Sequence, residues 1–269
     1  MNRINGKTVW ITGASSGIGE ALAYALSARD CNLIISSRKE VELLRVKNKC
    51  HNPEKVSVIP LDLEITETMT ETASKAIAEF GKIDILINNA GISQRSYIID
   101  TKLEVYKKLM EINYLGTVGI TKAVLPHFIS QQAGHFVTVT SLMGKFGAPP
   151  RSGYCGSKHA LHGFFDVLRL EHEKDGIDVT MVCPGYVDTN VAKNALTGDG
   201  SAQGTDDIEN KNGLQVDLVA KKMILAIEMK KHEKYMGGKE VIGVYLKRFF
   251  PRLLHRFVLR KTEKKSRQQ

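Results

Sequence analysis

The sequence predicts an α/β fold, a doubly wound parallel sheet with helices on both faces. Short apolar runs rich in β-branched residues alternate with stretches of helical periodicity along most of the chain. A strand, a helix and a further strand in succession are typical of a parallel sheet, because each crossover helix covers one of its faces. The 269 residues contain no internal linker and no repeat of roughly 20–50 residues, which favours one large domain.

The predicted elements follow in order from the amino terminus. The first apolar run ends at a glycine, as a buried strand would, and helical periodicity begins at Gly17. The alternation then repeats, and Gly81 stops the third predicted helix. The predicted strands are residues 7–13, 32–37, 55–63, 83–91, 135–141 and 177–185. The helices between the first four strands are residues 17–30, 38–49 and 66–81, and long helical stretches precede the last two strands.

Composition and cysteine usage limit the class of protein. Hydrophobic residues make up 42% of the chain and charged residues 25%, which argues against long disorder. The four cysteines are scattered without the spacing of metal ligands, so we expect no metal site, no disulfide and a reducing, cytoplasmic compartment. The first glycine-rich motif follows almost directly after Met1, so we expect no signal peptide, and no apolar run is long enough to span a bilayer.

The positive charge of the chain is concentrated at its carboxyl end. Nine Lys or Arg residues and one Glu between Lys247 and Gln269 give +8 of the total net charge of +9, so the first 246 residues carry only +1. A protein that binds nucleic acid through its folded body would carry a basic face there. The nearly neutral body therefore argues against a nucleic-acid partner.

The stretch TGASSGIG lies between the first predicted strand and the first predicted helix. Its glycines allow a tight turn, and the helix N-terminus that follows offers free N–H groups to a pyrophosphate. The G-x-x-x-G-x-G spacing in this context predicts a dinucleotide site in a Rossmann-like fold. The residues expected to contact the cofactor here are Thr12, Gly13, Ser15, Ser16, Gly17, Ile18 and Gly19.

The end of the second predicted strand bears on the choice between NAD and NADP. A protein that binds NAD usually places an Asp or Glu there for the ribose 2′-hydroxyl. Here Ser37 and Arg38 occupy the place, and Lys39 follows. A guanidinium suits a 2′-phosphate and stacks on adenine, so the sequence predicts NADP(H) with Ser37 and Arg38 as contacts. The alternative is a solvated charge at the start of a helix.

Tyr154 and Lys158 stand four residues apart in SGYCGSKHA. On a helix, residues with this spacing share one face. A phenol, with an ordinary pKa of about 10, donates a proton effectively near neutral pH only if its anion is stabilised, and a neighbouring ammonium does this. The pair is therefore either a tuned acid or an incidental surface pair, and the spacing taken alone favours the incidental pair.

Taken in order, these motifs make residues 5–240 resemble the short-chain dehydrogenase/reductase family. The resemblance adds Asp62 and Leu63 near the adenine, and Asn89, Ala90 and Gly91 beneath the cofactor. It also assigns Pro184, Gly185, Val187 and Thr189 to the segment around the nicotinamide. The catalytic residues that it implies are Asn113, Ser141, Tyr154 and Lys158.

The resemblance implies a reaction as well as a fold. In such an enzyme Tyr154 protonates a carbonyl oxygen, Ser141 holds that oxygen, and Lys158 stabilises the tyrosinate and binds the nicotinamide ribose. Asn113 anchors a water chain to Lys158. We expect carbonyl–alcohol interconversion on a small hydrophobic, lipid- or steroid-like substrate by a homo-oligomer. The alternative is a non-catalytic NADP-binding scaffold or redox sensor attached to a membrane or a partner.

The predicted domain ends near residue 240, and residues 241–269 form a basic amphipathic extension. Its apolar residues recur at helical spacing, and Pro251 is expected to start a second helix after a break. They are Leu246, Phe249, Phe250, Leu253, Leu254, Phe257 and Val258. Three positions are open for this face: on its own domain, on a second subunit, or on an anionic membrane surface as a peripheral contact.

The extension and the Gly-rich segment 196–213 resemble the branch of the family that contains 11-beta-hydroxysteroid dehydrogenases and acyl-dihydroxyacetone-phosphate reductases. Segment 196–213 is rich in Gly, Asp and Asn and poor in apolar residues. Such a composition predicts a mobile loop, either a lid or a disordered insert.

Overall fold

A computed structural model describes residues 4–266, so the first three residues of the predicted domain and the last three of the extension lie outside the described residues. Within this range the chain forms one parallel sheet in the order β3-β2-β1-β4-β5-β6-β7. The strands are β1 (Thr8–Thr12), β2 (Asn32–Ser36), β3 (Val56–Val58), β4 (Ile85–Asn88), β5 (Gly134–Val139), β6 (Ile177–Pro184) and β7 (Glu233–Met236). The predicted doubly wound parallel sheet is confirmed.

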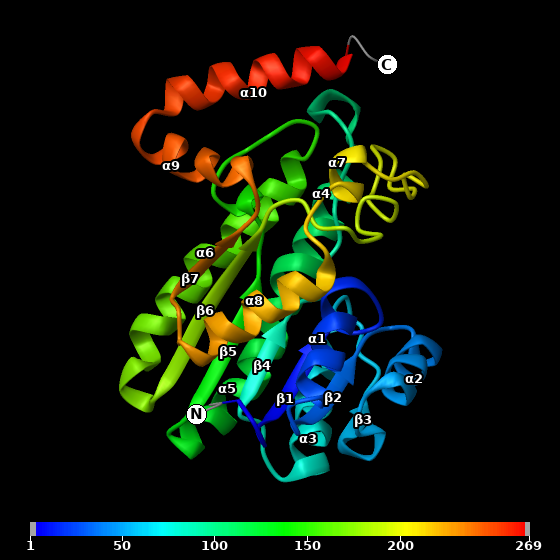
Figure 1. Cartoon of the computed structure of the whole chain (residues 1–269), viewed down its shortest axis with the longest axis vertical. Helices are drawn as coiled ribbons and strands as arrows, with labels where there is room; N and C mark the ends of the chain where they lie inside the picture. Colours follow the sequence, from blue (N-terminus) through cyan, green and yellow to red (C-terminus); the bar gives the residue numbers. More distant parts are fainter. Residues whose placement is uncertain (1–3, 267–269) are drawn as a thin grey trace.

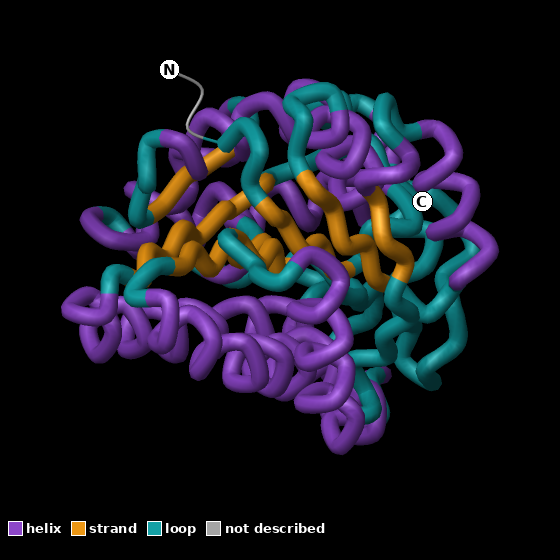
Figure 2. The backbone as a smooth tube through the Cα atoms, turned by 90° about the horizontal axis from the view of Figure 1, so that it is seen from below, coloured by secondary structure: helices purple, strands orange, loops and turns teal. Residues whose placement is uncertain are grey.

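Helices cover both faces of this sheet, and Figure 2 shows the strands between helical layers. The helices are α1 (Gly17–Ser27), α2 (Glu40–Lys49), α3 (Met69–Phe80), α4 (Leu103–Met110), α5 (Thr117–Gln131), α6 (Ser152–His172), α7 (Ile208–Lys211), α8 (Val216–Glu228), α9 (Ile242–Phe249) and α10 (Pro251–Ser266). Helices α1 and α8 pack side by side on one face, and α3 and α5 pack together on the other.

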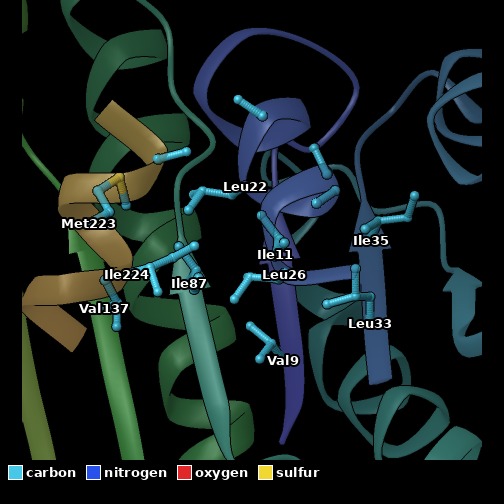
Figure 3. Close-up of a cluster of buried hydrophobic side chains, with 14 of the residues drawn as sticks. Val9, Ile11, Leu22, Leu26, Leu33, Ile35, Ile87, Val137, Met223 and Ile224 are labelled. Atoms are coloured by element: carbon cyan, nitrogen blue, oxygen red, sulfur yellow. The ribbon is translucent and has the colours of Figure 1, made fainter. Parts of the chain in front are cut away.

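Alternate residues of β1 supply the two apolar cores. Val9 and Ile11 point toward α1 and α8, where they meet Leu22 and Ile224 (Figure 3). Trp10 points the other way, into the core beneath α3, α5 and α6, and its indole N–H donates to Ser36 Oγ at 2.8 Å. Successive side chains of a strand face opposite sides, so a strand that is apolar throughout must be covered twice.

The third strand is shorter than the sequence predicted. Residues 55–63 were expected to be extended throughout, but β3 ends at Val58. Pro60 follows, but its missing N–H removes no bond to β2, because the N–H groups on either side of it, at Ile59 and Leu61, are the ones that face β2. The chain still runs beside β2, because Ile59 N donates to Ile35 O and Leu61 N donates to Ser37 O, both at 3.1 Å.

The order of the strands fixes where a ligand can bind. The chain first winds outward from β1 through β2 to β3, then returns to place β4 on the other side of β1. Helix α1, which connects β1 to β2, and helix α3, which connects β3 to β4, therefore lie on opposite faces and leave a crevice at the carboxyl ends of β1 and β4. The glycine turn follows β1, and Asn89 to Gly91 follow β4.

The carboxyl-terminal extension folds as two helices, as the position of Pro251 predicted. Helix α9 ends at Phe249 and α10 begins at Pro251. Figure 1 shows them together at one end of the molecule. Buried Leu254 packs with Leu142 and Phe146 of the main domain. Among the described residues, no helix is both long and apolar enough to cross a bilayer.

Candidate active site and cofactor cleft

A cavity of about 1630 Å³ opens at the carboxyl ends of the central strands. It runs from the glycine turn after β1 to Tyr154 on α6. Apart from Gly19 and Asn113, it is lined by all of the predicted site residues: Thr12, Gly13, Ser15, Ser16, Gly17, Ile18, Ser37, Arg38, Asp62, Leu63, Asn89, Ala90, Gly91, Ser141, Tyr154, Lys158, Pro184, Gly185, Val187 and Thr189. Residues far apart in the sequence therefore share one cleft.

The glycine turn is shaped as a cradle. Gly13 and Gly17 have φ of 68° and 58°, a left-handed region that favours glycine. A Cβ on Gly13 would lie 2.7 Å from Ala90 Cα, and one on Gly19 would lie 2.3 Å from Gly13 O. Gly19 thus contributes to the cradle from behind, by close packing, although it does not line the cavity.

The donors of this cradle fit a dinucleotide. Ser16 precedes α1 in an extended conformation, and its side chain does not cap the helix. The first N–H groups of α1 are therefore available to an anion, which the helix dipole also attracts. An uncapped helix end, a turn without room for side chains and a long adjoining cavity are the features that a pyrophosphate needs.

Thr12 and Asn89 hold the cradle together. Thr12 Oγ1 accepts hydrogen bonds from Asn89 N at 3.1 Å and Ala90 N at 3.2 Å. In return, Asn89 Nδ2 donates to Thr12 O at 3.0 Å and Gly13 O at 3.1 Å. These bonds tie the ends of β1 and β4 to each other, so the two side chains support the turn on which a cofactor would lie.

Asn113 lies behind the cleft in a π-helical turn, Glu111–Gly116, between α4 and α5. Its Oδ1 accepts from Ile92 N at 2.8 Å, and its Nδ2 donates to Ile92 O at 2.9 Å and to Ser157 Oγ at 3.0 Å. A Cβ placed on Gly91 would lie 3.0 Å from Asn113 Oδ1 and 3.3 Å from Lys158 Nζ. Asn113 therefore fixes the floor of the site beside Lys158.

Ser141, Tyr154 and Lys158 meet in the middle of the cavity. Ser141 follows β5, and its Oγ accepts from Met143 N at 3.1 Å and donates to Pro184 O at 3.2 Å. Lys158 is buried on α6, donates to Val139 O at 2.9 Å and lies 5.9 Å from the centre of the Tyr154 ring.

Lys158 is not the only charged residue close to Tyr154, and other groups change the pKa of its phenol. Burial raises the pKa of Tyr154, while the Ser141 hydroxyl and the positive charges of Arg95 and Arg151 lower it. Burial also lowers the pKa of Lys158 to about 8. Sequence reasoning missed both arginines, because neither belongs to the motifs.

The cations near the predicted ribose position form a second group. Arg38 is half exposed, lines the cavity and lies 3.6 Å from Glu64 Oε2. Arg45 of α2 also lines the cavity; it forms an ion pair with Glu20 and donates to Ser15 O at 3.1 Å. Arg45 was not singled out from the sequence, since it resembles any charged residue on an exposed helix.

The extension closes the other end of the same cavity. Its lining includes Leu246, Leu254, Phe257, Val258 and Lys261. Lys261 Nζ lies 3.3 Å from Tyr186 Oη and 5.1 Å from the centre of that ring. The single apolar face expected from the sequence is therefore divided. Leu254 is buried against the domain, whereas Phe249, Phe250, Leu253 and Phe257 are exposed by 43–68%.

Segment 196–213, which its composition predicts to be a mobile loop, contacts the site through its backbone and through one ion pair. Arg95 N donates to Leu196 O at 2.8 Å, and Leu196 N donates to Ser93 O at 2.9 Å. Short helix α7 follows within the segment, and Asp207 pairs with Arg95. Backbone pairing and a buried charge compensate here for the lack of apolar residues.

Beside the site, His162, Cys183 and Glu233 bring three potential metal ligands within 4.8 Å of one another. The sequence predicted no metal, and its scattered cysteines gave no sign of this cluster. Glu233 also forms an ion pair with Lys145 and accepts a hydrogen bond from Tyr235. The Glu233 carboxylate that a metal ion would need is thus already paired with the ammonium group of Lys145.

Fold and cleft together define a Rossmann-type α/β protein with a dinucleotide-shaped site. The family model described as short chain dehydrogenase matches residues 7–199, and the chain belongs to this family of oxidoreductases. Dehydrogenase/reductase SDR family member 7 of Homo sapiens is 51% identical over 197 residues, which cover 71% of this chain and 58% of that protein. The chain thus spans little more than half the length of this relative.

Other comparisons cover more of the chain. Dehydrogenase/reductase SDR family member 7B of Xenopus tropicalis is 37% identical over 267 residues, covering 96% of this chain and 86% of that protein. A solved short chain dehydrogenase/reductase of Burkholderia phymatum, in complex with NAD, matches with a TM-score of 0.83 at 22% identity, covering 94% and 96% of the two chains. One from Burkholderia cenocepacia, in complex with NADP, reaches 0.79 at 23% identity, covering 95% and 98%. The predicted family is confirmed, and the predicted branch is consistent with these relatives.

Proposed function

We propose that the chain is an NADP(H)-dependent oxidoreductase that interconverts a carbonyl and a secondary alcohol on a hydrophobic substrate. Residues 1–240 would form the catalytic domain, and the extension 241–269 would close its cavity. The observation that carries the proposal is that Ser141, Tyr154 and Lys158 open into the same cavity as the glycine cradle. A reactive phenol and a dinucleotide would then share one cleft.

A bound nicotinamide cofactor would supply the hydride for the carbonyl carbon, while side chains of this protein would stabilise the developing charge and supply the proton. As negative charge grows on the carbonyl oxygen, Tyr154 gives that oxygen its phenolic proton. Ser141 turns its hydroxyl from Pro184 O to the same oxygen and fixes its position. In alcohol oxidation Tyr154 takes the proton back.

Lys158 and Asn113 support this transfer. The ammonium of Lys158 lies beside the Tyr154 ring and stabilises the phenolate left after proton transfer. Asn113 keeps Ile92 and Ser157 in place around Lys158, and its carboxamide oxygen retains a lone pair toward a water chain. Replacement of the donated proton would follow this path from Lys158.

Replacing Tyr154 with Phe tests the chemistry, because the ring stays and the proton is lost. We expect turnover to fall by at least about a hundredfold, the scale of a general acid, while NADPH binding persists. Tyr106→Phe is the matched control, since Tyr106 loses only a hydrogen bond to Ser152 outside the cavity. Near-normal turnover in Tyr154→Phe would rule out the assigned chemistry.

The preference for NADP is supported by Arg38 at the end of β2 and by the lack of an acid at positions 37 and 38. The comparisons do not choose, because the solved neighbours include complexes with NAD and with NADP. In Arg38→Asp the loss of a charge-assisted contact of about 1.5–3 kcal/mol should weaken NADPH binding roughly 10- to 150-fold. NADH binding should change far less, and an unchanged NADPH/NADH ratio would refute the role of Arg38.

A hydrophobic substrate is supported by the half of the cavity beyond Tyr154. Its lining includes a group of apolar side chains: Leu142, Met143, Phe146, Leu246, Leu254, Phe257 and Val258. An NADPH-oxidation screen over ketosteroids, long-chain ketones, acyl-dihydroxyacetone phosphate and small carbonyls would test this class. Turnover confined to small polar carbonyls would contradict it.

The exposed residues of the extension support a peripheral membrane contact of an otherwise cytoplasmic protein. Phe249 and Phe250 are 68% and 62% exposed beside exposed arginines on α9 and α10. An aromatic face flanked by basic residues suits an anionic lipid surface. Full-length protein should float with anionic vesicles at low salt and less at high salt.

Point variants test this contact better than truncation, because cutting off α9 and α10 would open the substrate cavity. Phe249→Ser combined with Phe250→Ser should reduce flotation and leave NADPH binding intact. Ile99→Ser, which removes an exposed apolar side chain elsewhere, is the control. Flotation that survives the double substitution would argue against the membrane contact.

A homo-oligomer is supported by exposed apolar residues on α6. Val167 and Leu170 are 51% and 77% exposed on its outer side. Light scattering should report a mass above that of one chain, and Leu170→Glu should lower it. A single-chain mass for the unmodified protein would refute this assembly.

A further inference from the structure

Two arginines converge on one carboxylate beside Tyr154. Arg95 donates through Nε and Nη2 to Asp207 Oδ2, both at 2.7 Å, and Arg151 Nη2 lies 3.2 Å from the same oxygen. The three side chains are largely buried, with 9%, 10% and 16% of their surfaces exposed. All three line the cavity of the proposed active site.

The charges of this cluster do not balance. Two guanidiniums share one carboxylate, so one positive charge is left over within the cluster. Among the described residues, neither arginine pairs with a second acidic side chain. A buried excess charge destabilises the folded protein unless a nearby group of negative charge compensates it.

The surroundings add to this positive potential. Arg151 precedes the first turn of α6, the end of a helix where a cation is disfavoured. The free N–H groups of that turn are capped by a neutral amide, because Gln94 Oε1 accepts from Gly153 N at 2.7 Å and Tyr154 N at 3.3 Å. Helix end and guanidiniums thus act in the same direction on Tyr154.

We propose that Arg95 and Arg151 are electrostatic positioning residues that stabilise the Tyr154 phenolate, and that Asp207 sets the strength of this effect. The proposal rests on the proposed function of Tyr154 as acid and base. It adds a second source of positive charge to Lys158. It also makes the acidity of the phenol depend on segment 196–213, which delivers Asp207.

The arginines provide what Lys158 cannot provide across the pH range. Burial lowers the pKa of Lys158 to about 8, so its positive charge is lost as the pH rises through that value. A guanidinium keeps its charge far above it. The charges of Arg95 and Arg151 both act to lower the pKa of Tyr154 against the effect of burial.

Backbone pairing explains how the cluster stays in place. Ser96 pairs with Arg151 in an isolated β-bridge, and Gln94 pairs in the same way with Leu196. The Arg95 Nη1 donates to Ser93 Oγ at 2.8 Å and Gln94 O at 2.7 Å, so its fork cannot swing freely. Gln203 Nε2 holds the other oxygen of Asp207 at 3.3 Å.

Other ionisable groups also lie around Tyr154. On α6 they are Cys155 and Lys158, and Cys183 of β6 faces Lys158. The remaining ionisable groups in this half of the cavity are Tyr97, Tyr186, Lys239, Glu240 and Lys261. None of these residues is altered in the test, so a shift follows from the cluster alone.

The test compares substitutions whose effects have opposite signs. Arg95→Gln and Arg151→Gln remove positive charge and should raise the pKa of Tyr154 by about one pH unit. Asp207→Asn removes the compensating carboxylate and should lower it. The readout is an NMR titration of full-length protein labelled at tyrosine Cζ, with the Tyr154 signal assigned by its loss in Tyr154→Phe.

Kinetics give a second readout on the same proteins. The alkaline limb of kcat/KM for carbonyl reduction should move to higher pH in the two Gln variants and to lower pH in Asp207→Asn. Arg95→Lys keeps the charge and should restore the limb toward its original position. Lys75→Gln, which removes an exposed lysine that pairs with Glu71 on the same helix, should leave the limb unchanged.

The outcomes separate the cluster from the proposed function. Shifts of the same sign in the Gln and Asn variants, or no shift in folded variants, would overturn the proposal. Thermal melting checks folding, and Arg95→Lys tests the charge if Arg95→Gln is too unstable to study. If no carbonyl is turned over at all, the proposed function fails, while the NMR titration still decides the role of the cluster.

Discussion

Thr12 offers a direct test of how the cofactor cradle is held together. Thr12 is buried, with 2% of its surface exposed. Its hydroxyl oxygen accepts hydrogen bonds from Asn89 N at 3.1 Å and Ala90 N at 3.2 Å. Thr12→Val preserves the shape of the side chain and removes this acceptor. Two backbone N–H groups then lose their partner in a part-buried place.

The expected cost follows from those two donors. An unsatisfied buried donor costs about 1–3 kcal/mol, and because water in the cavity can reach these groups, the total should be about 2–4 kcal/mol. Thr12→Ser keeps the hydroxyl and loses one methyl group, which costs only about 0.5–1.5 kcal/mol. The comparison between the two variants isolates the hydrogen bonds.

Urea unfolding gives the free energies, and titration with NADPH reports the cradle. Thr12→Val should be less stable than Thr12→Ser and bind NADPH more weakly, because Asn89 and Ala90 line the cleft. Equal stabilities of the two variants would refute the reasoning. Unchanged NADPH binding in a destabilised Thr12→Val would show that the loop keeps its shape without the hydroxyl.

Three further predictions use other parts of the structure. Gly19→Ala should abolish measurable NADPH binding, since its Cβ would lie 2.3 Å from Gly13 O, whereas Gly163→Ala meets nothing within 4 Å and should bind normally. Burial lowers the pKa of His135 from 6.5 to about 4, so between these values the unfolded chain binds the proton and the folded protein does not. The unfolding free energy should therefore fall as the pH drops from 6.5 toward 4. Urea unfolding of His135→Gln should show a shallower fall. Leu254→Ala should loosen α10 and speed its proteolysis, because Leu254 is 8% exposed, while Leu259→Ala, at 45%, should not. Equal proteolysis of the last pair, or equal pH slopes for the histidine pair, would count against these assignments.

The strand pattern and the motifs could be predicted from the sequence for a simple reason. Residues at the carboxyl ends of parallel strands meet at one edge of the sheet. Thr12, Asn89 and Ser141 each stand at or just after such an end, so recognising the strands was enough to bring them together. Tyr154 and Lys158 needed only the period of a helix.

The limits of this reasoning lie where local pattern carries no information. The third strand was predicted too long because its apolar residues continue past Pro60, whereas its regular register with β2 ends at Val58. The extension was correctly broken at Pro251, but periodicity alone could not say that Leu254 turns inward while Phe250 stays exposed. That division depends on the surface against which the helix packs.

The sequence by itself therefore determined the parallel sheet, the glycine cradle and the order of the motif residues, because each depends on neighbours within a few positions along the chain. The tertiary structure alone decided the cluster at Tyr154 and the closure of the cavity by α10. Arg95 and Asp207 are 112 positions apart, and Arg151 and Asp207 are 56 apart. No local period links such residues. They meet because Leu196 pairs with the backbone of Ser93 and Arg95 in the loop after β4, and because the buried charge of Arg95 is stabilised by a carboxylate.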